Sequence, residues 1–247
     1  MIMKITEYNV NAKCSRDLCA AFVADTHDIL YDNIVSEIKK RNVDMILMTG
    51  DIIFGHDDHV VNGFEMLSAF VSLAPTFMCL GNHEGGAAEL VRNECKARGV
   101  NLLEQRSIDF EGIHIGGLTS GYIADNVGLE ENHWKQTPAP DVSWLQEFAS
   151  VEGYKILLSH HPEYYEKYIK NLDIDLTLSG HAHGGQWRFF GRGLFAPGQG
   201  ILPKYTSGIH DGRFIISRGL ANNAFVPRLF NPCELIFINL IKKRDND

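Results

Sequence analysis

Five apolar runs in this chain are each followed directly by polar residues of the kinds that bind metal ions. Each run has the length and composition of a buried strand. The runs are Cys19–Ala24, Met45–Thr49, Thr76–Leu80, Tyr154–Leu158 and Leu176–Ser179. Chemistry in an open α/β sheet collects beyond the carboxyl ends of its strands, so we expect the five polar segments to meet in one crevice.

The connections between these runs predict an α/β fold. Apolar residues recur at helical spacing between residues 29 and 38 and again between residues 60 and 71. A third helix is expected from about residue 87 to 98, with Gly99 well placed to stop it. Alternation of strand and helix at this spacing implies parallel pairing with right-handed crossovers.

The second half of the chain changes character. Residues 108–115 alternate around Glu111-Gly112, which predicts a hairpin, and residues 119–141 are polar and predict a surface excursion. A short helix is expected near residues 142–149. The segment from Gly184 to Gly212 carries eight glycines and predicts a long irregular loop of the kind that is usually functional. Strands at 214–217 and 235–241 close the chain, and without a repeat or linker we expect one domain over residues 1–247.

Composition limits the function classes. A formal net charge of −8 argues against a protein that binds a nucleic-acid backbone. No window approaches 18 consecutive apolar residues, so no transmembrane anchor is expected, and the polar first twenty residues do not resemble a signal peptide. The five cysteines are odd in number and form no C-x-x-C pair, which favours a reducing, cytoplasmic location.

The polar segments supply two carboxylates, one amide and four imidazoles as candidate metal ligands. They are Asp25, Asp51, Asn82, His27, His160, His181 and His183. A carboxylate can bridge two cations, and this mixture without cysteine suits Mn, Fe or Zn in a hydrolytic site better than a structural zinc. Each short motif alone is weak, but five in order at strand ends are a specific signal.

Together these motifs resemble the calcineurin-type metallophosphoesterase superfamily. The matching pieces are Asp25-x-His27, Gly50-Asp51, Gly81-Asn82-His83-Glu84, His160 and Gly180-His181-x-His183. Later strings resemble the YkuE-like bacterial phosphodiesterase branch, namely Gly180 to Gln186, Ser217-Arg218-Gly219 and Pro227 to Pro232. The resemblance implies a two-sheet β-sandwich flanked by helices around a βαβαβ core.

The resemblance also implies two divalent metal ions and a role for each candidate residue. Asp25, His27 and His183 would hold the first ion, and Asn82, His160 and His181 the second, with Asp51 as the bridge. His83 would be catalytic and face the substrate phosphate, while His161 lies outside the ligand set. Protein phosphatases of the superfamily carry an Asp where this chain has Phe54, so the usual carboxylate partner of His83 is missing.

The expected activity is that of a dinuclear-metal phosphoesterase. A hydroxide shared by two ions would attack a phosphodiester or pyrophosphate bond of a small-molecule or lipid-linked substrate. The alternatives are a phosphomonoesterase and a non-catalytic binding protein of the same fold. Gln186, Trp187 and Arg188 follow the last ligand and are candidate substrate contacts, although Trp187, Phe189 and Phe190 could instead close the core.

Overall fold

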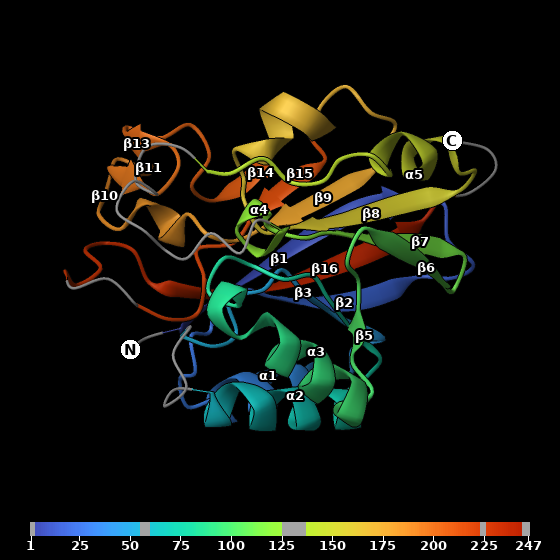
Figure 1. The fold of residues 1–247 in the computed structure, drawn as a ribbon, viewed down its shortest axis with the longest axis horizontal. Helices are drawn as coiled ribbons and strands as arrows, with labels where there is room; N and C mark the ends of the chain where they lie inside the picture. The colour runs from blue at the N-terminus through green and yellow to red at the C-terminus, as the bar shows by residue number, and fades with distance from the viewer. Residues whose placement is uncertain (1–2, 55–59, 125–136, 223–225, 244–247) are drawn as a thin grey trace.

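Two six-stranded sheets are stacked face to face, and helices cover their outer faces (Figure 1). The computed structural model describes residues 3–54, 60–124, 137–222 and 226–243. The predicted two-sheet α/β sandwich flanked by helices is therefore confirmed. No helix in these described ranges is long and apolar enough to cross a membrane.

The first sheet has the strand order β1-β16-β2-β3-β4-β5. Its strands are β1 (Met3–Ala12), β2 (Leu18–Val23), β3 (Met45–Met48), β4 (Thr76–Met78), β5 (Asn101–Leu102) and β16 (Cys233–Lys242). Strands β2 to β5 run parallel and are joined through α1 (Asp32–Arg41), α2 (Val61–Leu73) and α3 (Ala88–Arg98). This is the βαβαβ core that the sequence predicts.

The second sheet has the order β14-β15-β9-β8-β7-β6. Its strands are β6 (Arg106–Phe110), β7 (Ile113–Leu118), β8 (Tyr154–Ser159), β9 (Leu176–Ser179), β14 (Gly208–His210) and β15 (Phe214–Ile216). The predicted hairpin is β6–β7, and the predicted short helix is α5 (Leu145–Ser150). A π-helical turn at Tyr165–Ile169 lies, like α5, over the outer face of this sheet (Figure 1).

The central strands are buried on both faces, which is why they appear in the sequence as continuous apolar runs. In β2, Phe22 points between the two sheets, while Ala21 and Val23 pack toward the helices. In β3, Leu47 points between the sheets and Ile46 packs toward the helices. Because side chains alternate in direction along a strand, the same strand contributes to two cores, one between the two sheets and one between the first sheet and its helices.

Two predictions need correction. The strand β1 was not expected; it pairs in parallel with β16 along its whole length, from Met3↔Cys233 to Ala12↔Lys242. The surface excursion predicted at residues 119–141 is wrong at its start, because Ser120 and Ile123 are buried, and α4 (Gly121–Ala124) is folded in there. Residues 125–136 of that segment lie outside the described residues.

The segment from Gly184 to Gly212 is irregular except for two small hairpins and a bordering strand. The hairpins pair β10 (Arg188–Phe189) with β11 (Arg192–Gly193), and β12 (Phe195–Ala196) with β13 (Gly200–Ile201). The short strand β14 then extends the second sheet. The first hairpin begins five residues after His183, so the segment starts beside the strand ends described below.

Candidate metal centre

The fold brings the five polar segments to one place between the sheets. Strands β2, β3 and β4 of the first sheet and β8 and β9 of the second end next to one another. All seven residues proposed as metal ligands from the sequence are buried, whereas His83 is partly exposed with 19% of its side-chain surface accessible. This difference is expected if His83 faces a substrate.

Five of the candidate ligands have a left-handed backbone. The φ angles are 54° at Asp25, 43° at His27, 53° at Asp51, 63° at His181 and 45° at His183. Residues other than glycine rarely adopt this conformation, and each such residue costs of order 1–3 kcal/mol. Strained residues of this kind gather at functional sites, where the surrounding fold holds them in place.

Glycines let the ligand-bearing loops approach closely. A Cβ on Gly81 would lie 2.3 Å from Asp51 Oδ1 and 2.9 Å from His160 Nδ1. A Cβ on Gly180 would lie 2.6 Å from Asp25 Oδ2. Gly81 and Gly180 are therefore needed for the close packing of the loops that carry the candidate ligands.

Asp51 lies in the middle of the cluster. Its Oδ2 is 3.2 Å from His160 Nε2, 3.8 Å from His27 Nε2 and 4.0 Å from His83 Nε2. A single carboxylate oxygen thus faces three imidazoles that come from three different strand ends.

Two groups of side chains lie on either side of Asp51. In the first, His183 Nε2 is 3.3 Å from His27 Nε2 and 3.9 Å from Asp25 Oδ1. In the second, His160 Nε2 is 3.1 Å from Asn82 Oδ1, and the ring of His181 lies 5.0 Å from that of His160 between centroids. The resemblance assigns these two groups to two ions, and that assignment stays a prediction.

Main-chain contacts orient the central groups. His160 Nδ1 lies 2.7 Å from the carbonyl oxygen of Thr49 and must donate to it, which leaves Nε2 facing Asp51 and Asn82. The buried carboxylate of Glu84 accepts hydrogen bonds from the backbone amides of Gly81, Asp51 and Ile52, at 2.7, 2.9 and 2.7 Å. Glu84 therefore fastens the loop after β3 to the loop after β4.

His183 is held by two residues that come from far along the chain. A guanidinium nitrogen of Arg228 lies 2.9 Å from His183 Nδ1, and Asn231 Nδ2 donates to the carbonyl oxygen of His183 at 2.7 Å. The sequence alone assigns no role to Arg228 or Asn231. Both residues belong to the string from Pro227 to Pro232, which resembles the YkuE-like phosphodiesterase branch. That resemblance does not predict which residues their side chains contact.

His83 has a main-chain partner in place of the missing carboxylate. The carbonyl oxygen of Phe54 lies 3.2 Å from His83 Nδ1, and the Phe54 ring packs 5.7 Å from the His83 ring between centroids. The backbone amide of His83 also donates to Asp51 Oδ1 at 2.9 Å. His83 is thus tied to both the loop after β3 and the central carboxylate.

His161 is buried next to the second group. Its Nε2 is 2.7 Å from Ser120 Oγ and its Nδ1 is 3.4 Å from Glu163 Oε1, while its ring lies 4.3 Å from that of His181 between centroids. His161 also forms, with His160 and His181, one of the groups of three close enough to hold an ion, so its place outside the ligand set stays a prediction.

Burial and neighbouring charges set the protonation of the cluster. Burial lowers the pKa of His27 to about 3 and holds the pKa values of His181 and His183 well below the ordinary value. Burial also lowers the pKa of His160, but the charges of Asp51 and other carboxylates outweigh it and raise the value to about 9. Three of the four candidate imidazoles are therefore neutral, which is the form that binds metals.

The donor set fits divalent cations. Asp25, Asp51 and Glu84 are buried carboxylates, and within the described ranges none forms an ion pair with Lys or Arg. Buried charges are normally paired or coordinated to a metal. Carboxylate, amide oxygen and neutral imidazole are ligands shared by Mn, Fe and Zn, and the cluster contains four groups of three residues close enough to hold an ion.

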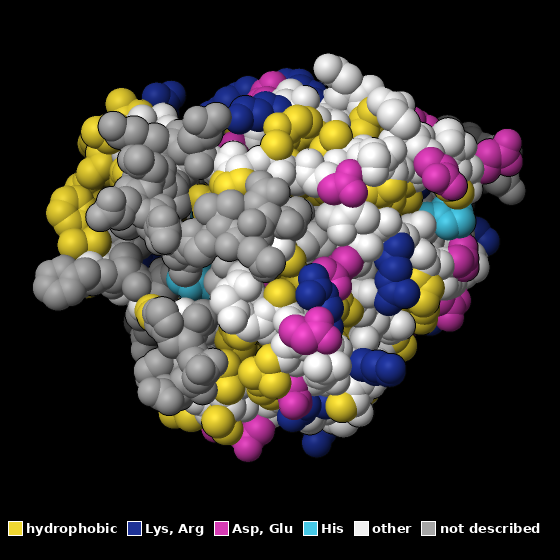
Figure 2. Space-filling view, in the orientation of Figure 1, with side chains coloured by type: hydrophobic (Ala, Val, Ile, Leu, Met, Phe, Trp, Pro, Cys, Tyr) yellow, Lys and Arg dark blue, Asp and Glu magenta, His cyan; other side chains and the backbone are white. Residues whose placement is uncertain are grey.

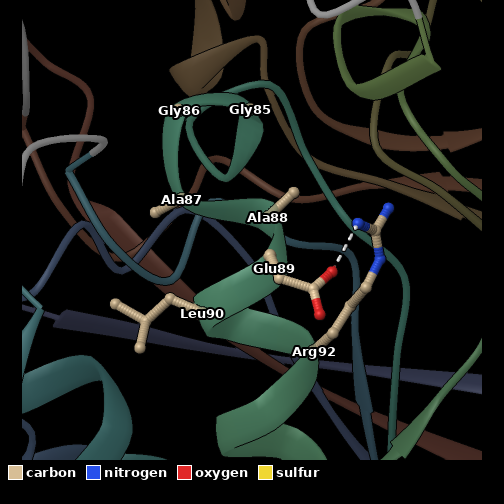
Figure 3. A pocket seen from close by; sticks show the side chains of 7 residues that line it. All are labelled: Gly85, Gly86, Ala87, Ala88, Glu89, Leu90 and Arg92. Carbon is tan, nitrogen blue, oxygen red and sulfur yellow. Dashed lines mark hydrogen bonds and ion pairs between the residues drawn. The ribbon is translucent and has the colours of Figure 1, made fainter.

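A separate cavity lies at the start of α3 and takes no part in this cluster. It has a volume of about 350 Å³, and residues 85–90 and Arg92 line it. Glu89 and Arg92 point toward one another there, 3.5 Å apart (Figure 3). None of the residues proposed as ligands lines the cavity, so we place the chemistry at the histidine–aspartate cluster.

The three candidate substrate contacts have different surroundings. Trp187 is exposed, whereas Arg188 is buried and donates to the carbonyl oxygens of Gly184 and Gly191. Gln186 Nε2 donates to Asn222 Oδ1 at 2.9 Å. A role in substrate binding stays a prediction for all three. The alternative that the loop aromatics close the core is wrong, because Trp187, Phe189 and Phe190 are all exposed.

Two stacked sheets with a buried histidine–aspartate cluster at their strand ends define the metallophosphatase-like class of α/β proteins. The sequence model of the calcineurin-like phosphoesterase family matches residues 20–185, and this chain belongs to that family.

Relatives and solved structures agree with this family. An uncharacterized metallophosphoesterase of Campylobacter jejuni is 29% identical over 224 residues, 88% of this chain and 56% of the relative. Phosphodiesterase YaeI of Escherichia coli is 26% identical over 186 residues, 68% of this chain and 61% of the relative. A dimetal phosphatase from Danio rerio shares the fold, with a TM-score of 0.55 at 13% identity over 82% of this chain and 87% of that one. The chain spans about half the length of the first three curated relatives.

Proposed function

We propose that this chain is a phosphoesterase that uses two divalent metal ions and hydrolyses a phosphodiester or pyrophosphate bond. The position of Asp51 carries the proposal, because its Oδ2 faces His27 at 3.8 Å on one side and His160 at 3.2 Å on the other. A carboxylate shared by two ligand groups is what a dinuclear site needs. Family membership and similarity to a protein named as a phosphodiesterase support the choice of reaction.

In this proposal each ligand group holds one ion. Asp25, His27 and His183 would hold the first ion, Asn82, His160 and His181 would hold the second, and Asp51 would be shared by both groups. Two divalent cations, whether Mn, Fe or Zn, activate water and neutralise phosphoryl charge when bound. Glu84 keeps the loops after β3 and β4 in register, so Asp51 and Asn82 stay aligned.

His83 is proposed to exchange a proton with the substrate. Its Nδ1 donates to the carbonyl oxygen of Phe54, so Nε2 is the atom left to face the phosphate. In the protonated ring, Nε2 can give its proton to the departing oxygen, a contribution of about 10²–10⁴-fold. The partial exposure of His83, in contrast to the buried ligands, supports this role.

We further place the chain beside the YkuE-like phosphodiesterase branch. The late motif of that branch includes Arg228 and Asn231, and both residues contact His183. Because these two residues contact a proposed metal ligand, the late motif and the ligand motifs belong to the same site in this proposal.

A substrate panel tests the proposal. Protein purified without chelator and supplied with Mn²⁺ is expected to hydrolyse bis(p-nitrophenyl) phosphate with a higher kcat/KM than p-nitrophenyl phosphate. Asp51→Asn should abolish both activities, because it weakens the hold on both ions. Asp109→Asn, which alters a carboxylate on β6, is the matched control and should leave both rates unchanged.

Each other outcome points to a different function. A clear preference for the monoester would assign the chain as a phosphomonoesterase. Metal binding without turnover of any ester would make it a binding protein of this fold. Normal turnover by Asp51→Asn would show that the assignment of the bridging ligand is wrong.

A further inference from the structure

Exposed apolar side chains gather on the lobe that follows His183. We define the apolar lobe as residues 186–203 and 226–231. Of the 15 large hydrophobic residues that are exposed within the described part of the chain, eight belong to this lobe: Trp187, Phe189, Phe190, Ile201, Leu202, Val226, Leu229 and Phe230. Figure 2 shows hydrophobic side chains collected at the left edge, over β10, β11 and β13. Apolar surface gathered in this way marks an interaction site.

The two segments of the lobe form one surface. Trp187 pairs with Leu229 in a parallel β-bridge, and the rings of Phe189 and Phe230 lie 6.0 Å apart between centroids. The second hairpin is attached through Leu202, whose amide donates to the carbonyl oxygen of Leu194 at 2.8 Å. The apolar side chains are therefore displayed together on a hydrogen-bonded frame.

Three of the most exposed side chains stand on turns with a left-handed backbone. The φ angle is 51° at Phe190, 53° at Leu202 and 52° at Phe230. Phe190 has 105% of its reference surface exposed, Phe230 73% and Leu202 72%. Glycine or asparagine suits such turns without strain, so a bulky apolar residue carries a cost there. Burial within this chain does not offset that cost, because all three side chains point into solvent.

Acidic residues are rare in the part of the chain that contains the apolar lobe. From residue 176 to residue 233 there is one acidic residue, Asp211, against six basic residues, although the whole chain carries 31 acidic and 23 basic residues. The apolar lobe contains no Asp or Glu, and Arg192 is exposed on its first hairpin. Of the three arginines in the lobe, Arg188 is buried, Arg228 is half-buried beside His183, and Arg192 is exposed. An acidic protein thus presents here an apolar surface that carries an exposed cation and no carboxylate, which is complementary to anionic lipid headgroups.

We propose that the apolar lobe docks on an anionic lipid bilayer. Phe190, Leu202 and Phe230 enter the boundary between headgroups and acyl chains, and Arg192 lies at headgroup level. The lobe is continuous with the candidate metal centre, because a guanidinium nitrogen of Arg228, which belongs to the lobe, lies 2.9 Å from His183 Nδ1. Docking therefore places the centre beside the headgroup layer. If the proposed function holds, on which this step rests, the substrate class is a lipid phosphoester at the membrane surface.

Vesicle flotation tests the docking. Wild-type protein is expected to float with vesicles of phosphatidylcholine and phosphatidylglycerol and to stay behind with phosphatidylcholine alone. The double variant Phe190→Ser/Leu202→Ser should bind at least about tenfold more weakly, and Arg192→Glu should also weaken binding. Ile108→Ser on β6 and Lys96→Glu on α3 match these changes in apolarity and charge at distant exposed sites, and should bind like wild type.

The other outcomes are decisive as well. Absence of binding to the anionic vesicles, or equal binding by wild type and the double variant, would overturn the proposal. A wild-type dimer that the double variant dissociates, seen by light scattering, would assign the lobe to a second copy of the chain and also overturn it. Asp51→Asn should dock like wild type, because docking needs no turnover. Docking by a wild-type protein that hydrolyses no ester would reject the proposed function and leave the docking surface standing.

Discussion

At the scale of single residues, a main-chain atom orients His83. The position that would carry the Asp is Phe54, whose carbonyl oxygen accepts from His83 Nδ1 at 3.2 Å. Every residue has a carbonyl group, so no side-chain pattern in the sequence predicts this contact. The histidine thus has a hydrogen-bond acceptor at Nδ1, while its Nε2 lies 4.0 Å from Asp51 Oδ2.

Replacing His83 should separate metal binding from turnover. His83→Asn is expected to retain metal while kcat falls by about 10²-fold or more, because the ring is proposed to transfer a proton and not to hold an ion. Elemental analysis and steady-state kinetics measure the two effects. His27→Ala is the comparison and should lose metal, since its ring lies 3.3 Å from His183 in the first ligand group. Metal loss from His83→Asn would make His83 a ligand, and an unchanged kcat would remove its catalytic role.

The glycine before Asn82 should be intolerant of a single methyl group. In Gly81→Ala the new Cβ would lie 2.3 Å from Asp51 Oδ1 and 2.8 Å from the backbone nitrogen of Asp51, so the central carboxylate must move. Overpacking of this kind typically costs about 1–3 kcal/mol of unfolding free energy, and metal content should fall with it.

Gly85→Ala is the matched control for this change. The nearest atom to a Cβ on Gly85 is 3.6 Å away, which is ordinary van der Waals contact. Denaturant unfolding and elemental analysis of the two variants should therefore differ clearly. Full metal content in Gly81→Ala would show that Asp51 is not held as described.

At the scale of elements, the strands that carry the ligands could be predicted and the edge strand could not. Strands β2, β3, β8 and β9 are enclosed on both faces and so appear as apolar runs. β1 lies at the sheet edge with largely exposed or half-buried residues, and its sequence MKITEYNVNA alternates only weakly. Its partner β16 lies more than 200 residues away in the chain, a distance over which no local pattern operates.

The same limit applies to the site. Every proposed ligand lies within four residues of the end of one of five strands, so local patterns are enough to find it. Arg228 and Asn231 reach His183 from 45 and 48 residues further along the chain. Only the folded chain brings these contacts together, which is why the sequence predicts the ligands but not the residues that hold them.

The end of α3 offers a test at this scale. Gly99 has a φ angle of 80° and its amide bonds back to Cys95 and Lys96, which closes the helix as the sequence predicts. A Cβ there meets nothing closer than Val71 Cγ1 at 3.9 Å, so Gly99→Ala adds backbone strain without a clash. We expect a loss of about 1 kcal/mol and a fall in Tm of about 2–4 °C. Gly99→Asn should recover most of the loss, because asparagine tolerates this conformation. An alanine variant as stable as wild type would contradict this account of the cap.

At the scale of the whole molecule, all five cysteines are in the thiol form, and they are enclosed to different degrees. Burial raises the pKa of every one, and it raises that of Cys95 to about 12. A higher pKa leaves less thiolate at a given pH, so native protein at pH 8 should react slowly with a thiol reagent, faster as the pH rises, and at all five thiols once unfolded. Rapid modification of one thiol in the folded protein would contradict the described packing.

Metal removal should lower the stability of the whole fold, because the centre joins both sheets. Asp25 and Asp51 follow strands of the first sheet, while His160, His181 and His183 follow strands of the second, so a bound cation links the two. Without cations the buried carboxylates keep only histidines as ion-pair partners within the described ranges.

A ligand present at a hundred times its Kd stabilises a protein by about 2.7 kcal/mol, which corresponds to about 5–10 °C in Tm here. Chelation should produce a fall of that size and added Mn²⁺ should reverse it, whereas Asp51→Asn should respond far less and Asp109→Asn should respond like wild type. A metal-loaded preparation whose Tm is indifferent to chelation would mean that the cluster does not hold the sheets together through metal.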